Sequence, residues 1–480
     1  MAVMEFDAII VGAGPNGLAA AIEIARTGRS VCVFEAKDTV GGGTRTAELT
    51  LPGFLHDVCS AIHPLGIASP FFKTLPLERH GLQWVHSPAS LAHPFDDGPA
   101  ALLHRSIQNT GATLGPDAPA YAKLFSAFVR NAESLIPEIL APPLHLPRNP
   151  WLLLRFGMSG IQSAQRFQDR HFRGKHARGL FTGIAAHSNM PLNSSPTAAF
   201  ALLLGTLGHT VGWPSVKGGS QNLADALAGY LTSLGGGILT GMHIKSLREL
   251  PPARAIFFDL SPRQILNLAF DRLPPNYRWE LQKYRSGPGV FKIDWALSSA
   301  IPWKSRECLQ AATVHVGGSA EEIIDCEDIV AAGRCPEKPF VLLAQQSLFD
   351  ESRAPNGKHT AWAYCHVPNN SKFDMTDRIE AQVERFAPGF RDCILQRHTM
   401  TAPEFEAYNP NYTGGDITGG IQNIMQIVAR PSLRVTPYAT PVPEFFICSA
   451  STPPGGGVHG MCGFHAARAA LTRILYNRKS

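Results

Sequence analysis

The order of apolar and polar positions predicts a strand, a turn, a helix and a second strand within the first 35 residues. Phe6–Val11 is a short, mainly apolar run of strand character, and Leu18–Arg26 repeats its apolar positions with a helical period. Ser30–Phe34 has the length of a buried strand. Near the other end of the chain, a run from Phe445 again indicates a buried strand, and a helix rich in alanine follows it.

Three glycines stand between the first predicted strand and the helix. Gly12 permits a tight turn, Gly14 lets the backbone approach a pyrophosphate, and Gly17 lets the helix pack close to the strand. The phosphates would then lie at the helix N-terminus. Glu35 ends the second strand, eighteen residues after Gly17, where a carboxylate can accept hydrogen bonds from both hydroxyls of an adenosine ribose. The pattern favours a dinucleotide site over an ordinary glycine-rich turn, with the residues Gly12, Gly14, Pro15, Asn16, Gly17, Glu35 and Ala36.

A second glycine loop, Gly41–Thr46, follows the second strand directly. Nicotinamide dehydrogenases normally continue to a third strand at this point, whereas a second glycine loop with an arginine can wrap the pyrophosphate and the side near a flavin. The sequence therefore favours FAD over NAD, and no second fingerprint predicts tightly held NAD(P)H. The further binding residues are Gly42, Gly43, Thr44 and Arg45.

The glycine loop near the C-terminus is predicted to cap the flavin. It leads from the strand at Phe445 to a helix that begins near His459, and a helix N-terminus carries partial positive charge. Aimed at the pyrimidine edge of an isoalloxazine, that charge would stabilise the reduced form. The alternative is a loop that only joins a strand to a surface helix. The expected contacts are Gly456, Gly457, Val458 and His459.

Several stretches resemble the phytoene-dehydrogenase-like flavoproteins, a branch of the group that also holds the amine oxidases. They are residues 41–46, 51–57, 60–64, 212–223, 259–263 and 445–460. The resemblance implies the α/β class, with a Rossmann-type, glutathione-reductase-like FAD-binding domain and an inserted α+β substrate domain. It also implies a strand at Ile238–Leu247 whose backbone near Ile244 meets the adenine. The aspartate that related flavoproteins often place beside the ribityl chain is absent, and that place holds Ser449, Ser451 and Thr452.

The resemblance also divides the chain into interleaved parts. The FAD-binding domain is expected at residues 1–81, 208–265 and 412–480, and its last part is expected to close over the flavin. The substrate domain is expected at residues 82–207 and 266–411.

The resemblance implies an FAD-dependent dehydrogenase or desaturase. It would transfer hydride from a hydrophobic small molecule to flavin N5 and pass the electrons to an external acceptor. The alternatives are a dioxygen-using oxidase of the amine oxidase type and a non-catalytic flavin-binding scaffold. His63, His209 and His459 lie in segments expected near the flavin, and histidine transfers protons well near neutral pH. The flavin itself is expected to carry most of the chemistry.

Composition argues against several other classes of protein. The 480 residues include nine cysteines, an odd number without a closely spaced pair, so we expect no disulfide scaffold, no metal site and no redox-active cysteine pair. The net charge of +5 is scattered along the chain, which argues against nucleic acid as a partner. Neither a signal peptide nor an apolar run of about 20 residues is evident, so we expect a cytoplasmic protein.

The proline-rich stretch Pro137–Trp151, with the apolar Leu152–Phe156 after it, is the least ordinary part of the expected substrate domain. Its prolines disfavour a regular helix. Its apolar side chains fit a hydrophobic substrate channel, a peripheral membrane contact or, most commonly for such stretches, packing against the protein's own core. The sequence leaves the oligomeric state open.

Overall fold

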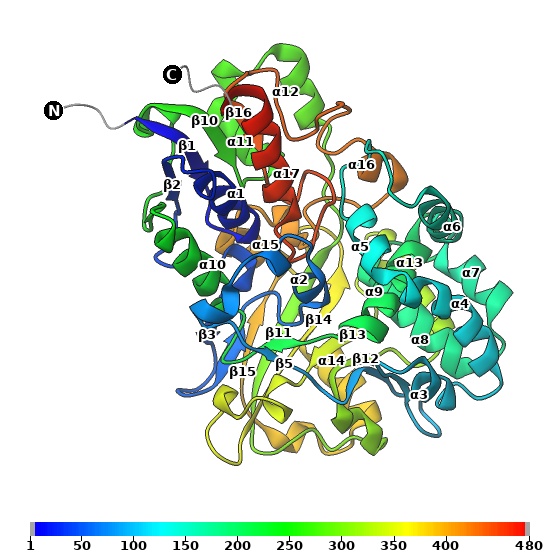
Figure 1. Ribbon diagram of the computed structural model, residues 1–480. Helices are drawn as coiled ribbons and strands as arrows, with labels where there is room; N and C mark the ends of the chain where they lie inside the picture. Colours follow the sequence, from blue (N-terminus) through cyan, green and yellow to red (C-terminus); the bar gives the residue numbers. More distant parts are fainter. Residues whose placement is uncertain (1–4, 476–480) are drawn as a thin grey trace.

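The computed structural model describes residues 5–475 and contains two main sheets (Figure 1). The first is a five-stranded parallel sheet in the order β16-β10-β1-β2-β9. Its strands are β1 (Phe6–Val11), β2 (Val31–Phe34), β9 (Gly237–Leu239), β10 (Ala253–Phe258) and β16 (Phe445–Ile447). Strands from near both ends of the described chain, β1 and β16, therefore belong to one sheet, and β10 lies between them.

Helices cover both faces of the parallel sheet because both faces of its strands are apolar. Ala8 and Ile10 of β1 belong to the core on one face, whereas Ile9 and Val11 belong to the core on the other. Two-sided burial of this kind is typical of parallel sheets and confirms the Rossmann-like α/β architecture. The helices are α1 (Pro15–Ala25), α10 (Gln221–Ser233) and α17 (Met461–Ala470) on the first face, with α11 (Pro262–Ala269) and α12 (Pro275–Gln282) on the second.

The strand predicted at Ile238–Leu247 is wrong in its length. Only Gly237–Leu239 pairs with β2, and a short 3-10 turn, Leu247–Glu249, follows later. The chain turns at Gly241, which has φ +68° and whose N–H donates to the carbonyl of Lys37. At this turn the backbone leaves the hydrogen-bonded pairing with β2 that a longer strand would continue.

The second sheet has seven strands in the order β15-β11-β14-β13-β12-β6-β7, antiparallel except for the pair β12–β6. One face packs against α14 (Thr376–Phe386) in an apolar core. The strands are β6 (Ala89–His93), β7 (Ala101–Leu103), β11 (Gly289–Leu297), β12 (Ala311–Val316), β13 (Val341–Ala344), β14 (His359–Val367) and β15 (Ile394–Met400). In the sequence, the strands of this sheet lie between strands of the parallel sheet. The exact domain boundaries stay predictions.

A layer of helices covers part of the other face of this sheet (Figure 1). They pack around an apolar cluster that includes Phe125, Phe167, Phe181 and Leu91 of β6. The helices are α3 (Ile107–Ala112), α4 (Ala118–Arg130), α5 (Ala132–Ile139), α6 (Pro150–Gly160), α7 (Ala164–His171), α8 (Lys175–Ala185), α9 (Thr197–Thr210) and α13 (Ala320–Ala331). The remaining short elements are α2 (Pro64–Ala68), α15 (Ala402–Tyr408), α16 (Ile424–Val428), the pair β3 (Thr46–Glu48) and β4 (Leu55–Asp57), and the pair β5 (Trp84–Val85) and β8 (Ser215–Val216).

The proline-rich stretch differs from the expectation in two ways. Pro137 lies inside α5, which tolerates the missing N–H because Leu135 and Ile136 anchor its buried face. The stretch packs only partly into the core, because Leu146 in the loop after α5 is 96% exposed and Trp151 at the start of α6 is 80% exposed, whereas Leu152 and Phe156 of α6 are buried. Within residues 5–475, no helix is long and apolar enough to span a bilayer.

Candidate functional site

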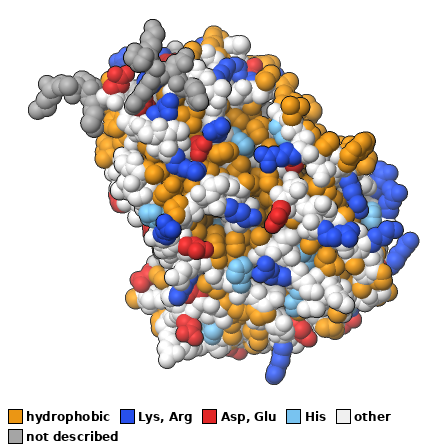
Figure 2. Space-filling view, in the orientation of Figure 1, with side chains coloured by type: hydrophobic (Ala, Val, Ile, Leu, Met, Phe, Trp, Pro, Cys, Tyr) orange, Lys and Arg blue, Asp and Glu red, His pale blue; other side chains and the backbone are white. Residues whose placement is uncertain are grey.

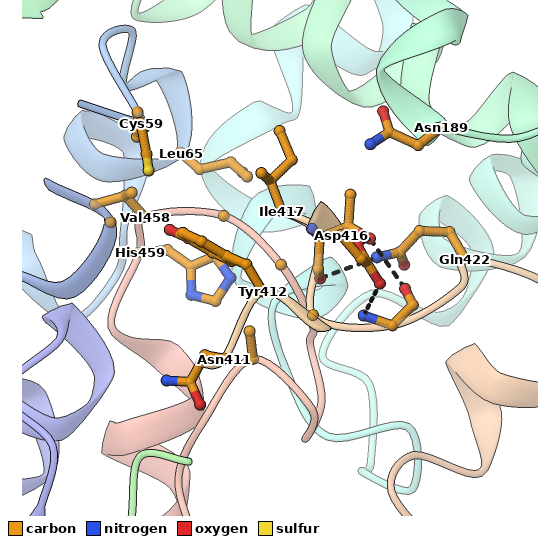
Figure 3. A pocket seen from close by; sticks show the side chains of 18 of the residues that line it. Cys59, Leu65, Asn189, Asn411, Tyr412, Asp416, Ile417, Gln422, Val458 and His459 are labelled. Atoms are coloured by element: carbon orange, nitrogen blue, oxygen red, sulfur yellow. Dashed lines mark hydrogen bonds between the residues drawn. The ribbon is translucent and has the colours of Figure 1, made fainter. Parts of the chain in front are cut away.

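A cavity of about 840 Å³ reaches from the carboxyl ends of the parallel strands to the seven-stranded sheet (Figure 3). Gly14, Asp259 and Ser449 line it just after β1, β10 and β16. Lys292 of β11 and Trp362 of β14 line its far wall. Ligands of open parallel sheets bind in this position, outside the carboxyl ends of the strands.

The first glycine turn has no room for side chains. Gly12 has φ +104°, and a Cβ atom on Gly17 would lie 2.1 Å from the carbonyl oxygen of Gly12. A Cβ atom on Gly14 would lie 2.6 Å from Oδ2 of Asp259. Gly14, Pro15 and Asn16 line the cavity, and the buried Oδ1 of Asn16 has no hydrogen-bond partner among residues 5–475. The turn therefore presents backbone to the cavity, as a dinucleotide requires.

Asp259 is a site residue that sequence reasoning missed. Its Oδ2 accepts a hydrogen bond of 3.0 Å from the N–H of Gly17, at the start of α1. Burial raises its pKa to about 7, against the opposing effect of the Gly17 hydrogen bond. Sequence reasoning placed Asp259 only within a family-like stretch, because its partner Gly17 is 242 positions away in the chain.

Glu35 and Arg45 form an ion pair of 3.2 Å beneath the two glycine loops. Glu35 also accepts hydrogen bonds from the N–H groups of Ala13, at 2.8 Å, and Lys37, at 2.9 Å. A carboxylate has about four acceptor positions, so these donors leave one for a ribose hydroxyl. Arg45 donates to the carbonyls of Thr39 and Gly42 and does not line the cavity. It braces the second loop, whereas the sequence suggested that it wraps a pyrophosphate.

The second glycine loop packs directly on the first. A Cβ atom on Gly42 would lie 3.1 Å from Cα of Gly14, and one on Gly43 would lie 2.1 Å from the hydroxyl oxygen of Tyr412. Gly42, Gly43 and Thr44 line the cavity. Tyr412 was not predicted; its side chain lines the cavity and packs in the same apolar cluster as Cys59 (Figure 3). The close packing leaves only backbone facing the place where a pyrophosphate is expected.

The terminal glycine loop also faces the cavity and is fixed by its neighbours. A Cβ atom on Gly456 would lie 2.5 Å from the carbonyl oxygen of Thr418, and Gly457 has φ +121°. Asp416 holds the opposing loop by accepting from the N–H groups of Thr418 and Gly420 (Figure 3). The positive φ and the close backbone contact explain why glycine stands at these positions.

His459 is buried beside Tyr412 and Val458 on the cavity wall (Figure 3). Burial lowers its pKa to about 4, so the ring is neutral at pH 7. Nδ1 accepts a hydrogen bond of 3.0 Å from the N–H of Met461, which places the proton on Nε2. Nε2 has no hydrogen bond of normal geometry to a residue that the structure describes, although backbone groups of Gly455 and Gly456 lie near enough to oppose the lowering of the pKa. His459 therefore offers a buried N–H donor in the cavity wall.

The other two candidate histidines have different surroundings. His63 lines the cavity, but its Nε2 lies 2.8 Å from the hydroxyl of Ser220 and burial lowers its pKa to about 4. His209 is not brought to the cavity. It ends α9, where its Nε2 bonds to the hydroxyl of Tyr121 at 2.8 Å within the helical layer. The catalytic candidacy of His209 is therefore corrected, because its ring lies among the packed helices and outside the cavity lining.

Ile244 and Ala36 lie outside the cavity lining. Ile244 is buried in the core on the second face of the parallel sheet, together with Phe34 and Leu250. Ala36 follows Glu35 on the exposed side of the same edge. Their contact with an adenosine stays a prediction.

A buried cation on the far wall is the second feature that was missed. Lys292 is 2% exposed, lines the cavity and forms a close ion pair with Asp294, two residues along β11. Two charged residues at alternate positions of an otherwise apolar strand share one face, and this pattern was a readable signal. His56 and His398 each approach Asp294 to 3.6 Å. Although burial raises the pKa of Asp294, Lys292 and the two histidines bring it below its usual value.

Comparison with known proteins places the chain among oxidoreductases. A family model described as an NAD(P)-binding Rossmann-like domain matches residues 10–75. Pyridine nucleotide-disulfide oxidoreductase domain-containing protein 2 of Mus musculus is 26% identical, over 97% of this chain and 93% of that protein. Hydroxyneurosporene desaturase of Cereibacter sphaeroides is 25% identical, over 97% of each chain. A solved structure of wild-type putrescine oxidase bound to putrescine has a TM-score of 0.62 at 17% identity and covers 99% of this chain and 100% of its own.

These matches agree with the geometry of the glycine turns and of the cavity beyond them. The desaturase match extends over almost the whole chain, and the putrescine oxidase match shows a common fold. The chain is a flavin-type oxidoreductase related to the carotenoid desaturases, and it has the same fold as the solved putrescine oxidase.

Proposed function

We propose that the chain is an FAD-dependent dehydrogenase that transfers hydride from a hydrophobic small molecule to flavin N5 and passes the electrons to an external acceptor. The observation that supports this proposal is the cavity itself. Its lining runs without interruption from the glycine turns to an apolar wall. FAD and an apolar substrate can therefore meet in one continuous space. The apolar wall includes Phe156, Phe200, Leu203 and Leu204 of helices α6 and α9.

The glycine turns fit FAD because their glycines present backbone to the nucleotide end of the cavity, beside the side chains of Asn16 and Asp259. Gly14 and Gly42 would hold the pyrophosphate, and the terminal loop at Gly456 would lie beside the ring system. A bound flavin supplies a two-electron acceptor. The nucleotide domain is then of the glutathione-reductase-like kind, with the seven-stranded sheet as the inserted part.

Two side chains of the wall can assist that chemistry. His459 offers the proton on Nε2 as a hydrogen-bond donor, and its low pKa keeps it neutral across the physiological range. Lys292 holds a positive charge in a site largely closed to water, where fixed charges stabilise developing negative charge most strongly. Both side chains would therefore favour the reduced, more negatively charged form of a flavin bound in the cavity.

Anaerobic absorbance spectroscopy tests the proposal. The purified holoprotein is mixed with pools of apolar alcohols, terpenes and polyenes, and bleaching of the flavin band is followed. Bleaching by one pool is expected. A flavin that dithionite reduces but no pool bleaches would favour the non-catalytic scaffold. Rapid peroxide formation after air is admitted would identify dioxygen as the acceptor and make the chain an oxidase.

Contact with an anionic lipid surface is proposed for the region around α6. Phe156 lines the cavity from this helix, while Trp151, Leu154 and Met158 of the same helix are exposed. Lysines and arginines gather beside it at the right of Figure 2, over α6 and α7. An apolar substrate could pass from a bilayer to the cavity along this helix. Co-sedimentation with anionic vesicles that is lost in Trp151→Ser supports the contact, and unchanged sedimentation contradicts it.

A further inference from the structure

The two faces of the seven-stranded sheet differ in polarity. On one face, Phe291, Ile293 and Leu343 belong to an apolar core. On the face toward the cavity, one row across the sheet is Lys292, Tyr364, Leu342 and His315, each paired with the next. The neighbouring row is Asp294, Trp362, Ala344 and Thr313. A face that only accommodated a hydrocarbon would not require polar residues in both rows.

The far end of these rows lies well away from Lys292. Three strand spacings separate Lys292 from His315, which is about 14 Å. His315 meets His187, with 3.0 Å between the two Nε2 atoms. Burial lowers the pKa of His187 to about 3 and that of His315 well below its usual value, so the pair is neutral. The contact brings together the segments that hold Asn189 and Thr313, each two residues from a histidine of the pair.

Besides Asn16 and His459 at the nucleotide end, three residues that line the cavity farther from the glycine turns have a buried polar atom without a hydrogen-bond partner in the described part of the chain. The atoms are Nδ2 of Asn189, Oγ1 of Thr313 and Nε1 of Trp362. The three residues are only 3%, 5% and 7% exposed, respectively. In Figure 3 the amide of Asn189 points into the cavity, on the side away from Val458 and His459. Leaving a buried donor unpaired is costly, so these atoms favour a ligand that satisfies them.

The charges around the cavity limit what that ligand can be. Lys292 is paired with Asp294, and Arg263, the other cation of the lining, is paired with Glu406. The donors at the far end are an amide and a hydroxyl, which are uncharged, beside a neutral histidine pair. They suit a neutral acceptor oxygen better than a carboxylate.

We propose that Asn189 and Thr313 form a subsite for an uncharged oxygen function, a hydroxyl or a carbonyl, at one end of an otherwise apolar substrate. Trp362 lies two strands nearer to Lys292 and can donate to a second oxygen. This inference rests on the proposed function for its claim that the ligand is a substrate. It narrows the substrate class from hydrophobic small molecules in general to apolar alcohols, aldehydes and ketones.

Isothermal titration calorimetry of the purified holoprotein tests the subsite. Dodecane, dodecanol and dodecanoate are matched probes, delivered from cyclodextrin. Dodecanol is expected to bind about tenfold tighter than dodecane, as one or two buried hydrogen bonds imply. Dodecanoate is expected to bind less tightly than dodecanol. Equal binding of dodecane and dodecanol, tighter binding of dodecanoate, or no binding of dodecanol would each overturn the inference.

Variants locate the effect. Thr313→Val removes the hydroxyl at nearly constant volume, and Asn189→Gly removes the amide while tolerating the φ of +52° at that position. Each is expected to reduce the preference for dodecanol over dodecane by about threefold or more. Thr360→Val is the matched control, because Thr360 lies in the same sheet with an unpaired buried hydroxyl but does not line the cavity. A preference that survives in both test variants, or falls equally in the control, contradicts the subsite.

The outcome is separable from that of the proposed function. Calorimetry reports binding and needs no turnover, whereas flavin bleaching reports the reaction. Selective binding of dodecanol by a protein whose flavin no compound bleaches would leave the subsite and refute the dehydrogenase. Bleaching by hydrocarbons and alcohols alike, without tighter binding of dodecanol than of dodecane, would leave the dehydrogenase and refute the subsite.

Discussion

The carboxyl group of Asp259 lies against the backbone of Gly17, with its Oδ2 accepting a hydrogen bond of 3.0 Å from the Gly17 N–H. This contact places a titratable acid at the N-terminus of α1, where the pyrophosphate of FAD is proposed to lie. Burial raises the pKa of Asp259 to about 7. The carboxyl group is therefore mostly neutral below pH 7 and mostly negative above it. In the negative form it would lie beside the negatively charged pyrophosphate.

FAD affinity should fall as the pH rises through about 7, because the ionised carboxylate of Asp259 repels the pyrophosphate. A loss of about tenfold between roughly pH 6 and pH 8.5 is expected. Asp259→Asn keeps the shape of the side chain without the charge, so its affinity should change little over the same range. Titration of apoprotein with FAD measures both. An equal pH dependence in the two proteins would show that another group is responsible.

Gly457→Val should lower FAD content while the fold survives. A Cβ atom at this position would lie 2.7 Å from Cδ1 of Leu65, and the φ of +121° disfavours any side chain. Either the loop or the side chain of Leu65 must then move, and both line the cavity. Gly235→Ala is the control, since Gly235 has φ +85° but no heavy atom within 4 Å of its Cβ position. Flavin absorbance per chain, with circular dichroism, gives the readout, and full FAD content in a folded Gly457→Val protein would mean that the loop does not contact the flavin.

Lys292→Met should destabilise the protein by about 3–5 kcal/mol, because it leaves the buried carboxylate of Asp294 without its ion pair. The double variant Lys292→Met with Asp294→Leu removes both charges and should recover most of this loss. Urea unfolding of the three proteins measures the difference. If the single and double variants have equal free energies of unfolding, the loss in the single variant does not come from the unpaired carboxylate of Asp294.

The nucleotide end of the site was predictable because its signals are local. A strand, three glycines, a helix and an acid after the next strand stand within 30 residues of Phe6, and each has one structural explanation. The terminal glycine loop was readable for the same reason. The roles within these segments were less certain, since Arg45 braces the second loop instead of facing the cavity.

The far wall of the cavity was not predictable from local patterns. Its polar rows arise from the register of four strands between residues 289 and 367, which periodicity does not reveal. His209 illustrates the opposite error, because a histidine near a family-like segment belongs to the core of the helical layer. Asp259 depends on a contact with Gly17 between the neighbouring strands β10 and β1, which are far apart in the sequence. Tertiary packing decided these positions, and only the alternation of Lys292 and Asp294 in β11 gave a hint.

The identity of the released cofactor tests the central claim most directly. Protein purified without added nucleotide is denatured, and the released flavin is separated and identified by chromatography and mass. The account predicts a yellow protein that releases FAD in an amount close to one per chain. Release of FMN, or a colourless and nucleotide-free protein in repeated preparations, would contradict the assignment of the two glycine turns and of the cavity between the sheets.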